Sequence, residues 1–246
     1  MSMFSLNGQR ALVTGANTGI GQAIAVGLAQ AGACVICAGR RACDETAAMI
    51  RDVGGTASSV LVDFADPMAG QGLFMGQPID ILVNNAGIIR RNDAVDFSEE
   101  DWDAVMDVNL KALFFTTQAF ARAVLARGGQ GKVVNIASLL SFQGGIRVPS
   151  YTASKHGVAG LTKVLANEWA AKGINVNAVA PGYISTDNTE ALRDDPQRNA
   201  AILDRIPAGR WGEADDIAGA ATYLCTPAAN YVHGAVLNVD GGWLAR

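Results

Sequence analysis

Short runs of aliphatic and β-branched residues alternate along the chain with longer segments in which apolar residues recur at helical spacing. Most of the short runs are apolar at consecutive positions, which is typical of strands that helices cover on both faces of a parallel sheet. The pattern predicts seven strands: Ala11–Thr14, Cys34–Ala38, Ser58–Val62, Ile79–Asn84, Lys132–Ile136, Asn175–Val179 and Val236–Val239.

The segments between these strands carry the apolar period of amphipathic helices. Helices are predicted at Ile20–Ala31, Glu45–Val53, Glu99–Asp107, Leu110–Ala126, Ala153–Ala171 and Ala214–Leu224. Strands and helices that alternate in this way predict an α/β fold, a single doubly wound Rossmann-type domain with a seven-stranded parallel sheet. The sequence shows no linker, so residues 1–246 are expected to form one domain.

Two segments depart from this alternation. Residues Phe64–Gly76 are weakly patterned and predict a short, poor helix. Residues Thr186–Arg210 are charged and contain Pro196 and Pro207. Because ligands of an open α/β sheet bind beyond the carboxyl ends of its strands, this long excursion, around residues 186–210, is a candidate substrate lid.

Composition narrows the class of protein. Of the 246 residues, half are hydrophobic and 17% are charged, which suits one well-buried α/β domain. The formal net charge of −4 argues against a nucleic acid or an anionic membrane as partner. No window of about 18 uninterrupted apolar residues predicts a membrane span. Residues 1–10 lack the apolar core of a signal peptide, so the expected location is the cytoplasm.

The cysteines and histidines do not predict a metal site. Cys34 and Cys37 have a Cys-x-x-Cys spacing, but they fall in a predicted strand, where positions three apart point to opposite faces. We interpret them as buried apolar thiols. His156 and His233 are the only histidines, which gives poor support to a histidine metal centre or a Ser-His-Asp triad.

A glycine-rich turn follows the first predicted strand. The residues Thr14-Gly15-Ala16-Asn17-Thr18-Gly19-Ile20-Gly21 open the first predicted helix. Glycines let backbone N–H groups approach a pyrophosphate, and the helix N-terminus favours its charge. The turn is therefore a candidate dinucleotide site, although a plain tight turn has the same glycines.

A second set of residues supplies acid–base chemistry. Tyr151 and Lys155 are four residues apart, so in a helix both side chains leave the same face. An ammonium group beside a phenol lowers its pKa from a value near ~10, which lets Tyr151 exchange a proton with a carbonyl or alcohol oxygen. Ser138, thirteen residues earlier, would hold that oxygen. With a dinucleotide at the glycine turn, these residues predict hydride transfer between a nicotinamide and a carbonyl/alcohol pair.

These motifs together indicate a family. The Gly-x-x-x-Gly-x-Gly turn, Asn84-Asn85-Ala86-Gly87, Ser138, Tyr151-Thr152-Ala153-Ser154-Lys155 and Pro181-Gly182 resemble those of the short-chain dehydrogenase/reductase family, over essentially the whole chain. The resemblance implies that Tyr151 is the general acid/base, that Lys155 lowers its pKa and binds the nicotinamide ribose, and that Ser138 polarises the substrate carbonyl. Asn109 matches the asparagine that kinks a helix and holds a proton-relay water.

The same resemblance implies the residues of a cofactor site. Asn85 would brace the sheet, Asp63 would touch the adenine, and the segment from Pro181 would fix the carboxamide. The implied cofactor contacts are Gly15, Asn17, Thr18, Gly19, Ile20, Arg40, Asp63, Asn85, Ala86, Gly87, Tyr151, Lys155, Pro181, Gly182, Ile184 and Thr186.

The local residues leave the choice between NAD and NADP open. An NAD site commonly has an acidic residue after its second strand, whereas Arg40 stands there in this chain. Arg40 would pair with a ribose 2′-phosphate, stack on the adenine or remain solvated. Thr18, in the glycine turn, adds no second positive charge.

A narrower resemblance indicates the substrate. Segments 86–93, 141–151 and 238–246 resemble those of the 2-deoxy-D-gluconate 3-dehydrogenase group, also called 2-dehydro-3-deoxy-D-gluconate 5-dehydrogenases. This resemblance implies NAD as cofactor, with NADP as the alternative, and a deoxy sugar acid or an alginate- or pectin-derived keto-deoxy uronate as substrate. Because a guanidinium group binds a carboxylate, the candidate substrate contacts are Arg91 or Arg90, Gln143, Arg147 and Tyr183, although a surface ion pair would explain each arginine equally well.

Two other functions fit parts of the sequence. A 3-oxoacyl thioester reductase shares the fold and the catalytic residues, and would favour NADPH and a basic patch. A non-catalytic dinucleotide sensor would tend to lack Tyr151 or Lys155, and both are present. The family resemblance also implies a homotetramer, in which the predicted helices Leu110–Ala126 and Ala153–Ala171 form one interface.

Overall fold

A seven-stranded parallel sheet forms the centre of the computed structural model, which describes residues 2–245. Its strands are β1 (Arg10–Thr14), β2 (Cys34–Gly39), β3 (Thr56–Leu61), β4 (Ile81–Asn84), β5 (Gly131–Ile136), β6 (Ile174–Pro181) and β7 (Val236–Val239). They lie in the order β3-β2-β1-β4-β5-β6-β7. The chain winds outward in both directions from β1 and β4, which confirms the predicted doubly wound fold.

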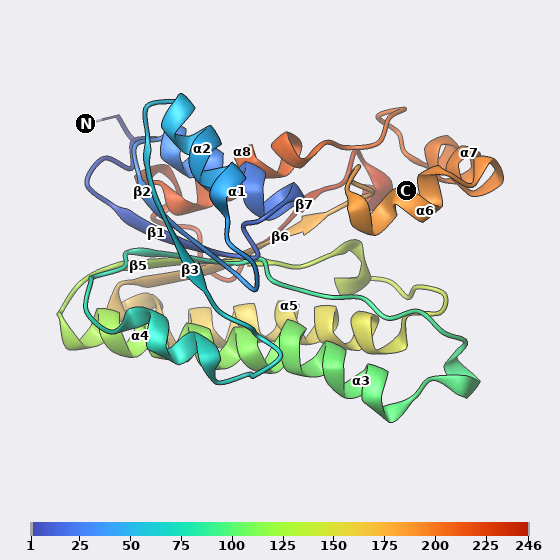
Figure 1. Ribbon diagram of the computed structural model, residues 1–246, viewed down its shortest axis with the longest axis horizontal. Helices are drawn as coiled ribbons and strands as arrows, with labels where there is room; N and C mark the ends of the chain where they lie inside the picture. The colour runs from blue at the N-terminus through green and yellow to red at the C-terminus, as the bar shows by residue number, and fades with distance from the viewer. Residues whose placement is uncertain (1, 246) are drawn as a thin grey trace.

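Helices cover both faces of the sheet (Figure 1). One layer contains α1 (Gly19–Gln30), α2 (Asp44–Asp52) and α8 (Ala214–Cys225), and the other contains α3 (Glu99–Met106), α4 (Leu113–Ala126) and α5 (Pro149–Trp169). Buried aliphatic side chains of the strands pack under each layer. This burial on two faces explains why the strand sequences are continuously apolar.

Helix α5 begins four residues before the predicted start at Ala153. Pro149 occupies its first turn, where a missing N–H group breaks no helical hydrogen bond. Tyr151 consequently belongs to the first turn of α5, and Lys155 follows on the same face one turn later. Strand β6 is also longer than predicted and runs to Pro181.

Helices α3 and α4 are joined, although the sequence predicted a break between them. The joining segment Asp107–Ala112 is a wide helical turn of the π type. The buried side chain of Asn109 lies in this turn, accepting a hydrogen bond from the Ile88 N–H (2.8 Å) and donating one to the Ile88 carbonyl (2.9 Å). Such turns are rare and are frequent at functional sites.

The two irregular segments contain short helices. Residues Ala69–Phe74 form a 3₁₀ helix, as the weak pattern predicted. The proposed lid contains α6 (Glu190–Arg193) and α7 (Pro196–Arg205), which stand at one end of the molecule close to the C-terminus (Figure 1). Helix α7 is not among the predicted helices. Pro196 occupies its first turn, and Asp195 caps it by accepting the Gln197 and Arg198 N–H groups (3.0 and 3.1 Å).

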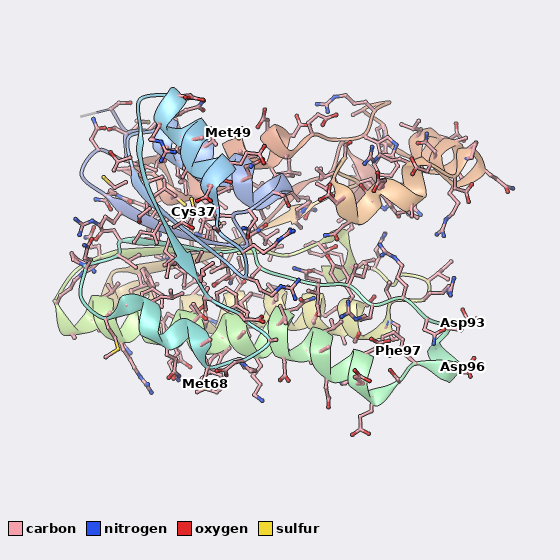
Figure 2. The ribbon with its side chains drawn as sticks, viewed as in Figure 1. Cys37, Met49, Met68, Asp93, Asp96 and Phe97 are labelled. Atoms are coloured by element: carbon pink, nitrogen blue, oxygen red, sulfur yellow. The ribbon has the colours of Figure 1, made fainter. Side chains whose placement is uncertain are left out.

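The cysteines are only partly buried. Cys37 lies inside the molecule, at the sheet (Figure 2), whereas Cys34 is exposed at the first position of β2. The prediction of buried thiols is therefore wrong for Cys34, because the start of the strand reaches solvent. All four cysteines are free, and no cluster of potential metal ligands occurs within residues 2–245. Within the same residues, no helix is both long and apolar enough to span a membrane.

Candidate active site

The glycine turn after β1 is tied to the loop after β4. The Thr14 hydroxyl oxygen accepts hydrogen bonds from the N–H groups of Asn85 (2.9 Å) and Ala86 (3.0 Å). The Asn85 side-chain amide in turn donates to the carbonyls of Thr14 (3.1 Å) and Gly15 (3.0 Å). Asn85 thus braces the two central strands, as predicted, while the contribution of Thr14 was not foreseen from the sequence.

The turn leaves room for a phosphate group. Gly15 has a φ of +64°, and a Cβ atom on it would lie 2.9 Å from the Asn85 amide nitrogen. A Cβ atom on Gly21 would collide with the Gly15 carbonyl oxygen. The resulting cavity, of about 200 Å³, is lined by Gly15, Thr18, Gly19, Ile20, Gly21, Asn85, Ala86, Gly87, Thr186, Asp187 and Asn188. Backbone N–H groups at a helix N-terminus fit the pyrophosphate of a dinucleotide.

Three other predicted cofactor residues lie at the outer part of this edge. Arg40 is exposed directly after β2, and Asp63 is exposed after β3, where its carboxylate accepts the Ala65 N–H. The Asn17 amide donates to the carbonyl oxygens of Arg41 (2.6 Å) and Ala42 (3.0 Å). Asn17 therefore fixes the loop that carries Arg40.

A second cavity, of about 150 Å³, continues from the first. The two cavities share Ile20, Asn85, Gly87, Thr186 and Asn188. The second also contains Ser138, from the end of β5, and Tyr151 and Lys155, from α5. It is completed by Pro181, Gly182, Ile184 and Thr186. The structure thus brings the predicted catalytic residues and the predicted carboxamide segment together in one continuous groove.

Burial shifts the pKa of both members of the catalytic pair. Burial raises the pKa of Tyr151, while a hydrogen bond to the Ser138 side chain and the positive charge of Arg91 act in the opposite direction. Burial also lowers the pKa of Lys155 from 10.5 to about 8. The Lys155 ammonium donates a 2.6 Å hydrogen bond to the carbonyl of Ile136.

This arrangement corrects one expectation. The sequence predicted that Lys155 lowers the pKa of Tyr151, whereas the net direction in this structure is upward. The reason is that the loss of hydration on burial outweighs the hydrogen bond to Ser138 and the positive charge of Arg91, which both act to lower the pKa of Tyr151.

Asn109 connects the loop after β4 to α5. Besides its two bonds to Ile88, its amide lies 3.3 Å from the Ser154 hydroxyl, which donates to the Tyr151 carbonyl (2.8 Å). Asn109 therefore supports the helical turn that carries Tyr151.

A larger cleft, of about 360 Å³, opens on the other side of Ser138 and Tyr151. The predicted substrate contacts Arg91, Gln143, Arg147 and Tyr183 all line it. Arg90 does not line it, because its guanidinium pairs with Asp101 (3.0 Å). Of the two arginines considered after β4, Arg91 is the one at the cleft.

Two arginines of the cleft already hold protein oxygens. Arg91 donates to the carbonyl oxygen of Asn188 (3.1 Å). Arg147 has a φ of +66° and pairs with Asp93 (3.0 Å) on the projecting segment before α3 (Figure 2). Positive φ is unfavourable for a residue with a Cβ atom, so this loop is held in a strained conformation at the rim of the cleft.

Two aromatic side chains pack against Tyr183, which lines the cleft. The Tyr183 ring lies 4.7 Å from that of Trp243 and 5.5 Å from that of Trp211, measured between centroids. The Trp243 indole N–H donates to the Gln143 side-chain oxygen (3.2 Å). The side-chain oxygen of Gln143 therefore already accepts a hydrogen bond within the protein. Arg198 also lines the cleft. Neither Arg198 nor Trp243 is among the site residues predicted from the sequence. For Arg198, the sequence signal was Asp195-Pro196, which is a typical start of a helix.

Comparison with known proteins agrees with this geometry. A family model of short-chain dehydrogenases, described as enoyl-(acyl carrier protein) reductase, matches residues 15–244. The chain belongs to the short-chain dehydrogenase/reductase family. As a member of this family it is an oxidoreductase that uses NAD(P), which confirms the predicted class of enzyme and cofactor.

Relatives within the short-chain dehydrogenase/reductase family match the whole chain. A 2-dehydro-3-deoxy-D-gluconate 5-dehydrogenase of Bacillus subtilis is 58% identical over 99% of this chain and 97% of its own. A structure from Agrobacterium tumefaciens, provisionally described as a 2-deoxy-D-gluconate 3-dehydrogenase with bound NADP, is 74% identical, with a TM-score of 0.99 over 100% of both chains. A provisionally described NAD(P)-dependent gluconate 5-dehydrogenase of Beutenbergia cavernae, with NADP at low occupancy, is 51% identical, with a TM-score of 0.96 over 100% of both chains.

Proposed function

We propose that this enzyme transfers a hydride between NAD(P) and a keto or hydroxy group of a deoxy sugar acid, with 2-dehydro-3-deoxy-D-gluconate as the first candidate. The observation that carries the proposal is the cleft beside Ser138 and Tyr151, which is lined by the guanidinium groups of Arg91, Arg147 and Arg198. Guanidinium groups favour a carboxylate-bearing substrate. The names of the relatives support the same substrate class.

The catalytic roles follow from the positions of the side chains. Ser138 and Tyr151, which line the same cavity, would together bind the substrate oxygen. Bound NAD(P)H supplies the hydride for reduction, and NAD(P)⁺ accepts it for oxidation. Tyr151 would give its phenolic proton to the oxygen in reduction and take it back in oxidation. Lys155 would bind the nicotinamide ribose. Asn109 would hold the helical turn that carries Tyr151.

We further propose that Arg40 contacts the ribose 2′-phosphate when NADP is bound. Arg40 is exposed at the carboxyl end of β2, and its loop is fixed by Asn17. The NADP in the Agrobacterium tumefaciens relative supports the NADP alternative over the NAD preference that the sequence suggested. The segment 186–210, with α6 and α7, is proposed to act as the substrate lid because it closes one side of the cleft.

A 3-oxoacyl thioester reductase is the less favoured function. An acyl thioester brings an apolar chain next to the reacting carbonyl, whereas this cleft brings positive charge there. A non-catalytic sensor is also less favoured, because Ser138, Tyr151 and Lys155 converge on one cavity.

We propose a homotetramer in which α4 and α5 form one interface. An open groove of about 600 Å³, lined mainly by apolar side chains of α4 and α5 such as Phe114, Phe115 and Leu161, supports this assembly. A cytoplasmic location is also proposed, which the four free cysteines support.

The test is the initial rate of reduction of a keto-deoxy uronate and of oxidation of 2-dehydro-3-deoxy-D-gluconate, with both forms of the cofactor in parallel. Turnover of the acids with little turnover of neutral ketones is the expected result. Turnover of acyl thioesters or neutral ketones alone would leave the family assignment intact and remove the sugar-acid assignment.

A further inference from the structure

We propose that Arg198, on the lid helix α7, is a specificity-determining residue that binds the carboxylate of the substrate. The proposal rests on the proposed function and deepens it, because it assigns the recognition of the acid group to one residue. In this proposal Arg198 binds the acid group, whereas Ser138 and Tyr151 act on the reacting oxygen.

The position of Arg198 places its charge at the cleft. It lies in the first turn of α7, where its backbone N–H is bound by Asp195 (3.1 Å), and it belongs to the lining of the 360 Å³ cleft together with Ser138 and Tyr151. Its positive charge acts on the Tyr183 hydroxyl in the same cleft. The guanidinium group of Arg198 therefore faces the space that a substrate would occupy.

The other cationic side chains near the cleft have protein partners. Arg91 donates to the Asn188 carbonyl, and Arg147 pairs with Asp93. Arg205, on the same helix as Arg198, stacks on the Trp243 ring, with 4.0 Å from its guanidinium carbon to the ring centre. The hydrogen bonds and ion pairs found among residues 2–245 include none to the Arg198 guanidinium, which leaves its planar set of donors for a carboxylate.

Helix α7 is firmly joined to the catalytic loop. Ile202 and Ile206 of α7 share a buried apolar cluster with Leu139, the residue that follows Ser138, and with Trp243. The stacked Arg205 adds a second attachment to Trp243. With the lid in the position seen in this structure, this packing sets the distance between Arg198 and the reacting oxygen at Ser138. A carboxylate bound by Arg198 would therefore fix which carbon of the substrate reaches Ser138.

The variants Arg198→Met and Arg198→Lys test this assignment, with Gln197→Ala as the matched control on the same turn of α7. Each is assayed with 2-dehydro-3-deoxy-D-gluconate and with its neutral amide, and the cofactor dissociation constant is measured by fluorescence titration. We expect Arg198→Met to raise KM for the acid roughly 10- to 100-fold, as for loss of a charged hydrogen bond. The KM for the amide and the cofactor affinity should stay near those of the wild type, Arg198→Lys should recover part of the loss, and Gln197→Ala should match the wild type.

Equal effects of Arg198→Met on the acid and on the amide, or no effect on either, would overturn the proposal. If the wild-type enzyme turns over no sugar acid, the proposed function fails, and the role of Arg198 is decided separately by calorimetry. In that experiment D-gluconate and neutral D-gluconamide are titrated into the enzyme–NADP complex. Selective loss of D-gluconate binding in Arg198→Met supports the carboxylate site, and unchanged or absent D-gluconate binding refutes it.

Discussion

The ammonium nitrogen of Lys155 lies 5.5 Å from the centre of the Tyr151 ring and directs its hydrogen bond to the main chain and not to the phenol. Burial moves both groups toward their neutral forms, because it raises the pKa of Tyr151 and lowers that of Lys155. A raised pKa keeps the phenol of Tyr151 protonated in the free enzyme, which is the form that carbonyl reduction requires. The same shift makes the phenol a weaker acid, so Tyr151 needs the positive charges around it to act near neutral pH.

Replacement of Tyr151 by Phe removes the proposed proton donor and leaves the ring in place. We expect kcat to fall by about 10²- to 10⁴-fold, the usual contribution of a general acid or base. Cofactor affinity, measured by fluorescence titration, should change little because the groove keeps its shape. Turnover close to that of the wild type would assign the proton transfer to another group.

Lys155 should make the stability of the protein depend on pH between about 8 and 10.5. In this window the unfolded chain binds the lysine proton and the folded chain does not, so the stability of the folded state increases as pH rises. Relative to Lys155→Met, the wild-type free energy of unfolding should gain about 3 kcal/mol from pH 8 to 10.5, and the difference should be constant below pH 8. Denaturant unfolding of both proteins across this range measures the effect. Parallel curves would show that Lys155 keeps its ordinary pKa.

Arg91 should tune the acidity of Tyr151. Its positive charge lowers the pKa of the phenol, so Arg91→Ala should raise that pKa. The rising limb of alcohol oxidation, which requires the phenolate, and the falling limb of carbonyl reduction should both move to higher pH. Arg91→Lys keeps the charge and serves as control. A pH profile of kcat that is the same in the alanine variant and in the wild type would contradict this electrostatic role.

The positive φ of Arg147 predicts that a glycine variant is more stable than an alanine variant at this position. Both Arg147→Gly and Arg147→Ala lose the ion pair with Asp93. At a φ of +66°, alanine keeps the steric strain and glycine relieves it. We expect the glycine variant to be more stable than the alanine variant by about 1 kcal/mol, in contrast to the usual cost of glycine. Thermal unfolding of the two proteins decides this, and a more stable alanine variant would show that the loop relaxes without strain.

Arg40 should discriminate between the two cofactors. If it binds the 2′-phosphate, Arg40→Ala should raise KM for NADPH about 10-fold or more, as for loss of a charged hydrogen bond, and leave KM for NADH nearly unchanged. Arg41→Ala is the neighbouring control. Equal changes with both cofactors would instead assign Arg40 to stacking on the adenine.

The sequence predicted the sheet and most helices because hydrophobic periodicity depends on burial, and burial is nearly complete in the inner strands β1, β4, β5 and β6. Ser138, Tyr151, Lys155 and the glycine turn were predictable because they lie at the carboxyl ends of recognisable strands or one turn apart on a helix. Their convergence on one groove follows from the parallel strand order together with the packing of α5 against the end of β5.

Other features depend on contacts between distant residues. The kink at Asn109 was implied only by the family resemblance and not by the local pattern, because the wide turn accompanies hydrogen bonds to Ile88, which is 21 residues away in the sequence. The direction of the pKa shift of Tyr151 depends on how deeply the fold buries the phenol and on the approach of Arg91. The place of Arg198 at the cleft depends on α7, whose apolar residues pack on Trp243.

Trp243 makes the C-terminal segment a support for the wall of the cleft, because it packs behind residues that line it. It contacts Gln143, Tyr183 and Arg205, which come from three different parts of the chain. Purification tags for activity assays are therefore better placed at the N-terminus, away from this wall. Trimming by a carboxypeptidase as far as Trp243 would remove a buried side chain that holds both the cleft and helix α7 in place, so a loss of activity during storage calls for a measurement of the protein's mass.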